Sequence, residues 1–120
     1  MAQHNDLGKE GEELAVAHLL RSGYEILVQN YVFQKGEIDI IARKGNTIVI
    51  VEVKTRSTPD FGAPQDFLKP AQIKRLVKTA DHFMELYGED DLEVRFDIFA
   101  IIKNKAGTKT EHIEDAFYHF

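Results

Sequence analysis

A run of β-branched residues, Ile48-Val49-Ile50-Val51, leads directly into Glu52 and, two positions later, Lys54. Apolar residues this dense predict a strand in the middle of a sheet, covered on both faces. Because side chains alternate along a strand, Glu52 and Lys54 share one face with Ile48 and Ile50. An ionised carboxylate buried there costs several kcal/mol unless another group compensates its charge. The strand therefore predicts a functional group of charges at this point of the sheet.

The residues before this strand predict a hairpin. Residues 36–42 (GEIDIIA) indicate a second strand, and Lys44-Gly45-Asn46 supplies a turn whose residues tolerate positive φ. Antiparallel pairing of the two strands can bring Asp39 beside Glu52 on the same side of the sheet. Two carboxylates and Lys54 then converge.

Length and composition limit the class of protein. The 120 residues fit a single domain, 1–120, with a modest core, and 43% hydrophobic with 29% charged residues is ordinary for a globular chain. The absence of cysteine excludes disulfides, thiolate nucleophiles and cysteine-based zinc sites. No signal-like N-terminus and no run of roughly 18 apolar residues is present, so we expect a soluble, cytoplasmic protein without a membrane span.

The charge is unevenly distributed. A net charge of −5 at first argues against a nucleic-acid partner, because phosphate binding depends on Lys and Arg. Residues 35–78, however, hold nine basic and five acidic side chains, a balance of +4, while the rest of the chain carries −9. The region around the hairpin is therefore predicted to be positive, although any single lysine of this set is more often an ordinary solvated surface residue.

The pattern along the chain predicts an α/β sandwich around a mixed central sheet, with the order α-β-β-β-α-β-β. Helices are expected at 6–22, capped by Asn5 or Asp6, and at 70–87, which begins at Pro70 and ends at Gly88. Strands are expected at 24–28, 31–33, 37–43, 47–55, 93–102 and 110–117, with a loop at 58–64.

The first predicted helix has a glutamate, Glu12, on its apolar face. At about 100° per residue, one face collects an apolar stripe with Glu12 near its centre. The stripe consists of Gly8, Glu12, Ala15, Val16, Leu19 and Leu20. Two interpretations of Glu12 are about equally supported by the sequence. Its methylene groups can pack while its carboxylate reaches solvent or an arginine, or its carboxylate can belong to the functional site.

Three acids and a lysine suggest metal-dependent chemistry. Mg²⁺ is commonly held by one or two carboxylates together with substrate phosphate oxygens, and Asp39 and Glu52 are suitable ligands, with Glu12 as a possible third. Lys54 is placed to orient or deprotonate an attacking water, or to neutralise charge in the transition state. The alternative is a structural Glu52–Lys54 pair at a sheet edge.

At these residues the sequence resembles the PD-(D/E)XK nuclease superfamily and, within it, the YraN-type family of bacterial predicted endonucleases. The resemblance covers nearly the whole chain. It is carried by Gly8-x-x-Gly11-Glu12-x-x-Ala15, Gly23-Tyr24, Asn30-Tyr31, GEIDII at 36–41, VEVKTR at 51–56, Phe61-Gly62 and Arg95-Phe96-Asp97.

This resemblance implies a restriction endonuclease-like three-layer sandwich, a mixed central β-sheet flanked by helices. It implies Asp39 and Glu52 as ligands of Mg²⁺ (or Mn²⁺), Lys54 as the catalytic lysine and Glu12 as the carboxylate that completes the site in related Holliday-junction resolvases. Two positions depart from the pattern. Ile38 stands where the superfamily has proline, and Gln72 stands where a later helix often carries lysine.

The function predicted from the sequence is a Mg²⁺-dependent endonuclease that hydrolyses phosphodiester bonds. DNA is favoured over RNA as the substrate class, which the sequence leaves open, and branched or repair-intermediate DNA is a candidate substrate. Nucleic-acid contacts are expected from Arg43, Arg56, Lys69, Gln72 and Lys74. The alternative is a catalytically weak or inactive nucleic-acid-binding module, or an adaptor in a DNA-processing assembly.

Three further expectations concern single residues and assembly. The five histidines show no paired metal-ligand spacing. Asp97, on an apolar strand, is expected to be a structural partner of Arg95 or Arg56. The resemblance to resolvases and the aromatic C-terminal segment 116–120 suggest a homodimer.

Overall fold

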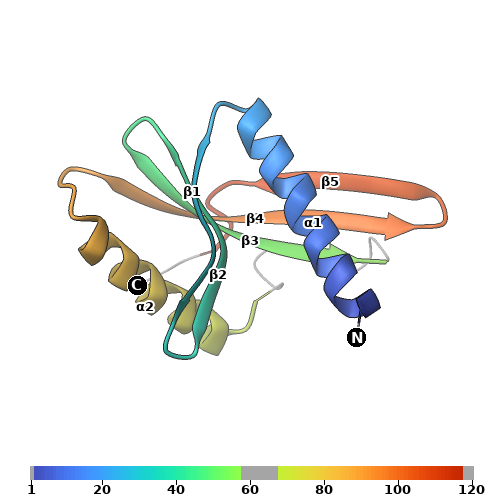
Figure 1. Cartoon of the computed structure of the whole chain (residues 1–120), viewed down its shortest axis with the longest axis horizontal. Coiled ribbons are helices and arrows are strands. Elements are labelled where there is room, and N and C mark those ends of the chain that lie inside the picture. Colours follow the sequence, from blue (N-terminus) through green and yellow to red (C-terminus); the bar gives the residue numbers. More distant parts are fainter. Residues whose placement is uncertain (1, 58–67, 118–120) are drawn as a thin grey trace.

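The structure is a computed structural model that describes residues 2–57 and 68–117, with side chains described from residue 8 onward. These residues form seven elements in the predicted order (Figure 1). They are α1 (Ala2–Arg21), β1 (Glu25–Phe33), β2 (Gly36–Lys44), β3 (Thr47–Arg56), α2 (Pro70–Tyr87), β4 (Glu93–Asn104) and β5 (Gly107–Ile113). The predicted loop 58–64, including Phe61 and Gly62, lies outside the described residues.

The five strands form one mixed sheet in sequential order, β1-β2-β3-β4-β5. The pairs β1–β2, β2–β3 and β4–β5 are antiparallel, whereas β3 and β4 are parallel. Ile48 through Val51 on β3 are at most 2% exposed. The structure thus confirms the predicted hairpin and the central position of the β-branched strand.

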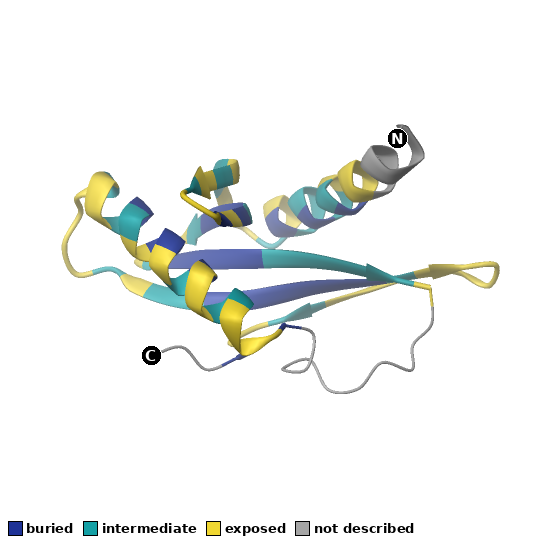
Figure 2. Ribbon diagram, turned by 90° about the horizontal axis from the view of Figure 1, so that it is seen from below, coloured by how far each residue is buried: buried dark blue, intermediate teal, exposed yellow. Residues whose placement is uncertain are grey.

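One helix packs against each face of the sheet (Figure 2). The core on the α2 side joins Leu76, Ala80 and Phe83 of the helix to Ile48 and Ile50 of β3. The core on the α1 side joins Ala15 and Leu19 to Val49, Val51 and Phe99. The alternation predicted for β3 is therefore confirmed, and the chain is a compact α/β structure. Neither described helix is long and apolar enough to cross a membrane.

Helix α1 differs from its predicted form at both its start and its buried face. It begins at Ala2, so Asn5 and Asp6 lie inside the helix and do not cap it. Gly11 rather than Gly8 is buried, and a Cβ atom on Gly11 would lie 3.0 Å from Thr55 Oγ1. Leu20 is 56% exposed. The predicted stripe is confirmed at Ala15 and Leu19 and wrong at Gly8 and Leu20. The error arose because Gly11, whose lack of a side chain gives no signal in a hydrophobicity pattern, makes the close approach to the sheet.

Two strands also have different limits from those predicted. β1 is one continuous strand, 25–33, where two short strands were predicted. A bulge between Ile26 and Val28 and the positive φ of Asn30 (56°) allow the strand to continue through residues that interrupt the sequence pattern. β5 ends at Ile113 rather than 117, and Phe117 packs on Phe96 of the same chain. Phe117 therefore needs no second subunit to be buried, and residues 118–120 lie outside the described part.

The start of β2 is held tightly against α2. A Cβ atom on Gly36 would lie 1.9 Å from Thr79 Oγ1, a separation that no side chain at position 36 tolerates without movement. Thr79 is 1% exposed, and its hydroxyl donates to the Arg75 carbonyl at 2.7 Å. This contact fixes the strand that carries Asp39 against the helix that carries Gln72 and Arg75.

Candidate active site

Asp39 stands where β2 and β3 separate. Their antiparallel pairing ends at Ile40 and Val51, one step before Asp39 and Glu52 would face each other. Beyond that point the backbone N–H of Val53 donates to Asp39 Oδ2 at 2.8 Å. The carboxylate of Asp39 therefore accepts a β3 backbone N–H beyond the last backbone pair, and this hydrogen bond fixes the side chain where the two strands separate.

Glu52 is the one described residue with a buried side-chain oxygen, Oε1, that has no hydrogen-bond partner among the described residues. Burial, reinforced by the neighbouring charge of Asp39 and opposed by Lys54, raises the pKa of Glu52 to about 8. Burial also raises the pKa of Asp39, against the opposing effect of the Val53 N–H. The predicted convergence of the two carboxyl groups is thus present and is electrostatically unfavourable when both are ionised.

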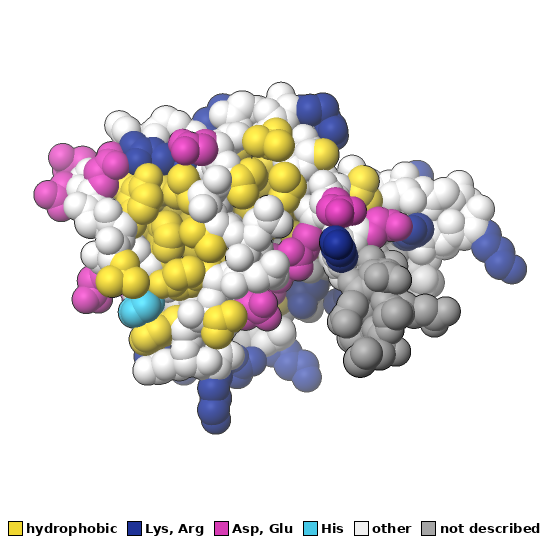
Figure 3. Space-filling view, in the orientation of Figure 1, with side chains coloured by type: hydrophobic (Ala, Val, Ile, Leu, Met, Phe, Trp, Pro, Cys, Tyr) yellow, Lys and Arg dark blue, Asp and Glu magenta, His cyan; other side chains and the backbone are white. Residues whose placement is uncertain are grey.

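Two hollows meet at Asp39. One, of about 210 Å³, is lined by Asp39 and Glu52 together with Lys35, Gln72 and Arg75. The other, of about 460 Å³, is lined by Asp39 together with Glu12, Lys54 and Arg56. Figure 3 shows acidic side chains crossing this face of the molecule beside the hydrophobic surface over β1 and β2. Asp39 therefore links the Glu52 side of the site to the Lys54 side.

Glu12 lies near Asp39 but has its own partner. Its Oε1 accepts a hydrogen bond from Asn30 Nδ2 at 3.2 Å, and burial, followed by the charge of Asp39, raises the pKa of Glu12. Within residues 2–57 and 68–117, no group of three acidic or histidine side chains is arranged to hold one metal ion. The structure brings Glu12 to the edge of the site, in the same hollow as Asp39 and within electrostatic range of it.

The predicted nucleic-acid contacts divide into two locations. Arg56 lines the hollow that contains Lys54, and Gln72 lines the hollow that contains Glu52, while its Oε1 accepts the backbone N–H of Lys69 at 3.1 Å. Lys74 is exposed on the same helix. Arg43, in contrast, lies at the far end of β2, where Glu89 binds its guanidinium through two hydrogen bonds of 2.7 and 2.9 Å. The structure does not bring Arg43 to the site.

The sequence predicted no role in this site for Lys35, Arg75 or Asn30. Arg75 lines the hollow with Glu52 and Gln72, and its spacing of three from Gln72 on a helix was the available signal. Asn30 reaches Glu12 only because β1 lies alongside α1, with φ of Asn30 at 56°. No local pattern in the sequence indicates that contact.

In metal-free buffer at pH 8, we expect Glu52→Gln to unfold at a higher temperature than the wild type. The pKa of Glu52 is raised from 4.5 to about 8 on folding, so the wild type loses stability as the pH rises through that interval, by a few kcal/mol at most. The Glu52→Gln variant does not lose this stability, because its amide does not ionise. Thermal unfolding in a chelator at pH 4 and pH 8 measures it, with Glu37→Gln, an exposed acid lining the same hollow, as control. If the melting temperatures of wild type and Glu52→Gln differ by the same amount at pH 4 and pH 8, the pKa of Glu52 is not raised by folding.

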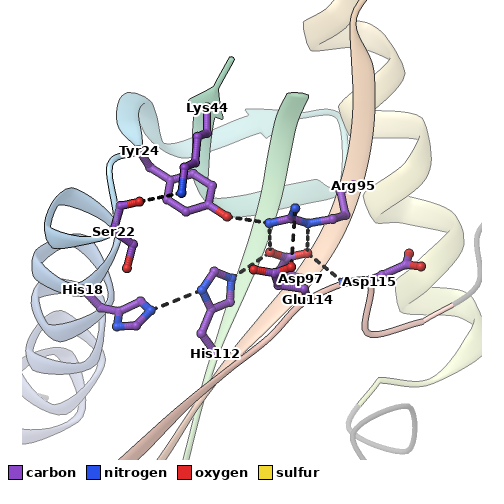
Figure 4. A network of polar contacts seen from close by, with 9 residues as sticks. All are labelled: His18, Ser22, Tyr24, Lys44, Arg95, Asp97, His112, Glu114 and Asp115. Atoms are coloured by element: carbon purple, nitrogen blue, oxygen red, sulfur yellow. Dashed lines mark hydrogen bonds and ion pairs between the residues drawn. The ribbon is translucent and has the colours of Figure 1, made fainter. Parts of the chain in front are cut away.

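A second polar cluster lies on the α1 side of the sheet (Figure 4). Asp97, 0% exposed, accepts two hydrogen bonds of 2.9 Å from Arg95 and one from the Asp115 N–H at 2.9 Å. Its Oδ2 also lies 2.7 Å from His112 Nε2, and His112 Nδ1 lies 3.2 Å from His18 Nε2. The prediction that Asp97 is a structural partner of Arg95 is confirmed.

The electrostatics of this cluster fit a structural role. Burial alone would raise the pKa of Asp97, but hydrogen bonds from His112, Arg95 and the Asp115 N–H together lower it. Arg95 also donates to the Tyr24 hydroxyl at 2.6 Å. Every oxygen of the buried carboxylate is therefore partnered, in contrast to Glu52.

Comparison with known sequences places the chain in a family. Residues 11–101 match the family model described as "Uncharacterised protein family UPF0102". UPF0102 proteins of Christiangramia forsetii and Flavobacterium psychrophilum are 66% and 59% identical over 120 residues, covering all of both chains. The UPF0102 protein of Phocaeicola vulgatus is 42% identical over 118 residues, 98% of this chain and 97% of the relative. The YraN-type resemblance is confirmed at this level, and the chain belongs to the UPF0102 family.

Proposed function

We propose that this chain is a Mg²⁺-dependent endonuclease of restriction endonuclease-like fold that hydrolyses phosphodiester bonds in nucleic acid. One observation carries the proposal. Glu52 Oε1 is buried without a hydrogen-bond partner among the described residues, beside a second carboxylate. A buried acceptor left unpaired is unfavourable, and two adjacent carboxylates increase the penalty unless a cation joins them.

The donor set suits Mg²⁺. This ion takes oxygen ligands, keeps several waters and is commonly bound by one or two carboxylates plus substrate phosphates. Asp39 and Glu52 would hold it, and the hollow they share is lined by Lys35, Gln72 and Arg75, which suit phosphate oxygens. Two protein carboxylates are enough for such a site, so Glu12 would support it from its edge.

Lys54 supplies the remaining chemistry. Its charge acts on both Asp39 and Glu52, and it lines the second hollow with Arg56. From there its ammonium group can orient the attacking water, or neutralise charge that develops on the phosphate. A metal ion held by Asp39 and Glu52 would supply Lewis-acid polarisation of the phosphoryl group and would lower the pKa of water at the site. The basic residues around both hollows favour a phosphate backbone as substrate, and DNA is the expected class.

Cleavage of a substrate panel tests the proposal. Linear, flapped and four-way-junction DNA, with RNA counterparts, should be incubated with protein and Mg²⁺, Mn²⁺ or chelator. We expect cleavage that requires the metal and is absent in Glu52→Gln. Cleavage of no substrate by wild-type protein that binds them would favour the alternative below. A homodimer remains a prediction, to be checked by sedimentation with and without DNA.

The alternative is a nucleic-acid-binding module or adaptor without cleavage. The observation that favours it is the Glu12–Asn30 hydrogen bond, which occupies the acid expected to complete the site. Gln72, whose oxygen accepts the Lys69 N–H, also brings no positive charge to the hollow.

Glu12→Gln decides the role of that carboxylate. The amide is nearly isosteric and Glu12 is only partly buried, so we expect melting within a degree or two of wild type. Cleavage should fall roughly tenfold or more, as for groups that support metal ligands. A variant that melts higher and cleaves normally would make Glu12 a structural residue only. Glu13→Gln is the matched control, because Glu13 is exposed and lines a third hollow, of about 850 Å³, together with Glu12 and Asn30.

A further inference from the structure

The β4–β5 hairpin projects beyond the rest of the sheet (Figures 1 and 2). The last β3–β4 pair is Arg56 with Ile102, and β4 continues from there to Asn104. All side chains from Lys103 to Glu111 are exposed. This stretch therefore buries no core and contributes little to the packing of the fold.

The hairpin is nevertheless held in a fixed direction. Lys103 forms an ion pair with Glu10 of α1, and Asn104 Nδ2 donates to the Ser57 carbonyl at 3.0 Å, just after β3. Asn104 Oδ1 accepts the Ala106 N–H at 2.9 Å and so orders the turn. Contacts on both sides thus fix an exposed arm beside the strand that carries Lys54 and Arg56.

The arm is basic. Residues 103–110 contain three lysines and no acid, and Glu111 is the first acidic residue further along β5. Glu10 neutralises Lys103, whereas the side chains of Lys105 and Lys109 have no acidic partner within the described residues. Figure 3 shows Lys and Arg side chains standing out at this end of the molecule. Two positive charges therefore remain available to a ligand.

The strand register connects these charges to the candidate site. Arg56 pairs with Ile102, and Ile102 pairs with Lys109, so all three lie in one row across the sheet. Side chains two residues apart share a face, so this row lies on the face of Glu52 and Lys54. Lys109 is two strand spacings, about 10 Å, from Arg56. Lys54, Arg56 and Lys109 therefore follow one another outward from the carboxylates on one face.

We propose that the β4–β5 hairpin is a second contact surface for the phosphate backbone of the nucleic acid, with Lys105 and Lys109 as the contacting residues. This inference rests on the proposed function and extends the expected footprint beyond residues 35–78. The turn lies about 10 Å beyond the Arg56 row, which corresponds to about three base-pair steps. The hairpin therefore fits a nucleic acid whose phosphate backbone extends several nucleotides past the cleaved bond.

The experiment measures binding without cleavage. A fluorescein-labelled mixed-sequence 30-base-pair DNA duplex is titrated with full-length protein in chelator, over a series of NaCl concentrations, and followed by anisotropy. Each lost phosphate contact should reduce the slope of log K against log[salt] by about 1. Lys105→Gln/Lys109→Gln should therefore reduce it by about 2 and weaken binding roughly tenfold or more near 100 mM salt.

Two controls make the result specific. Lys105→Arg/Lys109→Arg keeps both charges and should bind as wild type, and Arg21→Gln removes one exposed charge from the other end of α1 and should leave the slope unchanged. Wild-type affinity and slope in the double Gln variant would overturn this proposal while leaving the cleavage site intact. Wild type that binds no duplex, or binds only vesicles containing anionic lipid, would overturn both this inference and the proposed function's substrate.

Discussion

Replacing Lys54 by alanine should reduce metal-dependent cleavage by about 10²–10³-fold while leaving nucleic-acid affinity within about threefold of wild type. The physical reason is position. Lys54 lies within electrostatic range of Asp39 and Glu52 and lines the hollow that Asp39 borders, so its charge acts where the reacting phosphate would sit. Single-turnover cleavage and anisotropy binding on the same protein measure the two effects separately.

Neighbouring basic residues provide the comparison. Arg56→Ala and Lys74→Ala should weaken binding and flatten its salt dependence, with cleavage falling only as occupancy falls. Lys54→Arg keeps the charge but cannot give up a proton, so it distinguishes charge neutralisation from proton transfer. If all three alanine variants lose binding equally, with residual cleavage following occupancy, then Lys54 is another phosphate contact and has no separate catalytic role.

Asp97→Asn should lower the free energy of unfolding more than any of the other substitutions proposed for this chain. The carboxylate is fully buried and accepts hydrogen bonds from Arg95 and the Asp115 N–H, with His112 Nε2 at 2.7 Å. Removing its charge leaves Arg95 without its buried partner, which typically costs about 3–5 kcal/mol. For a chain of this length that corresponds to a melting temperature roughly 10–20 °C lower, measured by thermal unfolding at pH 7.

Glu114→Gln is the matched control. Glu114 pairs with the same guanidinium at 3.7 Å but is 60% exposed, so its loss should change stability by less than about 1 kcal/mol. The pKa of Asp97 is lowered by folding, so its contribution is present above the unfolded pKa and is lost as the pH falls through the folded value. Equal effects of the two substitutions would show that the buried pair adds nothing beyond a surface ion pair.

The sequence was sufficient for the parts of the fold that depend on local pattern. The β-branched run predicted the central strand, the turn at residues 44–46 predicted the hairpin, and Pro70 and Gly88 predicted the limits of α2. Together these brought Asp39 to Glu52. The pairing also explains Lys54, because a strand places every second side chain on one face.

The parts that could not be predicted depend on contacts between distant segments. Asp39 accepts the Val53 N–H only because the two strands separate beyond the Ile40–Val51 pair, and strand divergence leaves no local signature. Arg43 belongs to the positive region by sequence, yet Glu89, 46 residues later, binds it at the far end of β2. Charge counted along a chain therefore overestimated the basic surface at the site and missed the lysines of the β4–β5 hairpin.

Metal binding to Asp39 and Glu52 is the central claim, and thermal unfolding across a Mg²⁺ or Mn²⁺ titration tests it most directly. At ten times the dissociation constant, the metal should add about 1.4 kcal/mol of stability, a melting shift of a few degrees. Asp39→Asn keeps an oxygen for the Val53 N–H but removes the charge, so the shift should disappear, whereas Asp81→Asn, an exposed acid of α2, should retain it. A wild type that melts as Asp39→Asn does at every metal concentration would contradict the metal site.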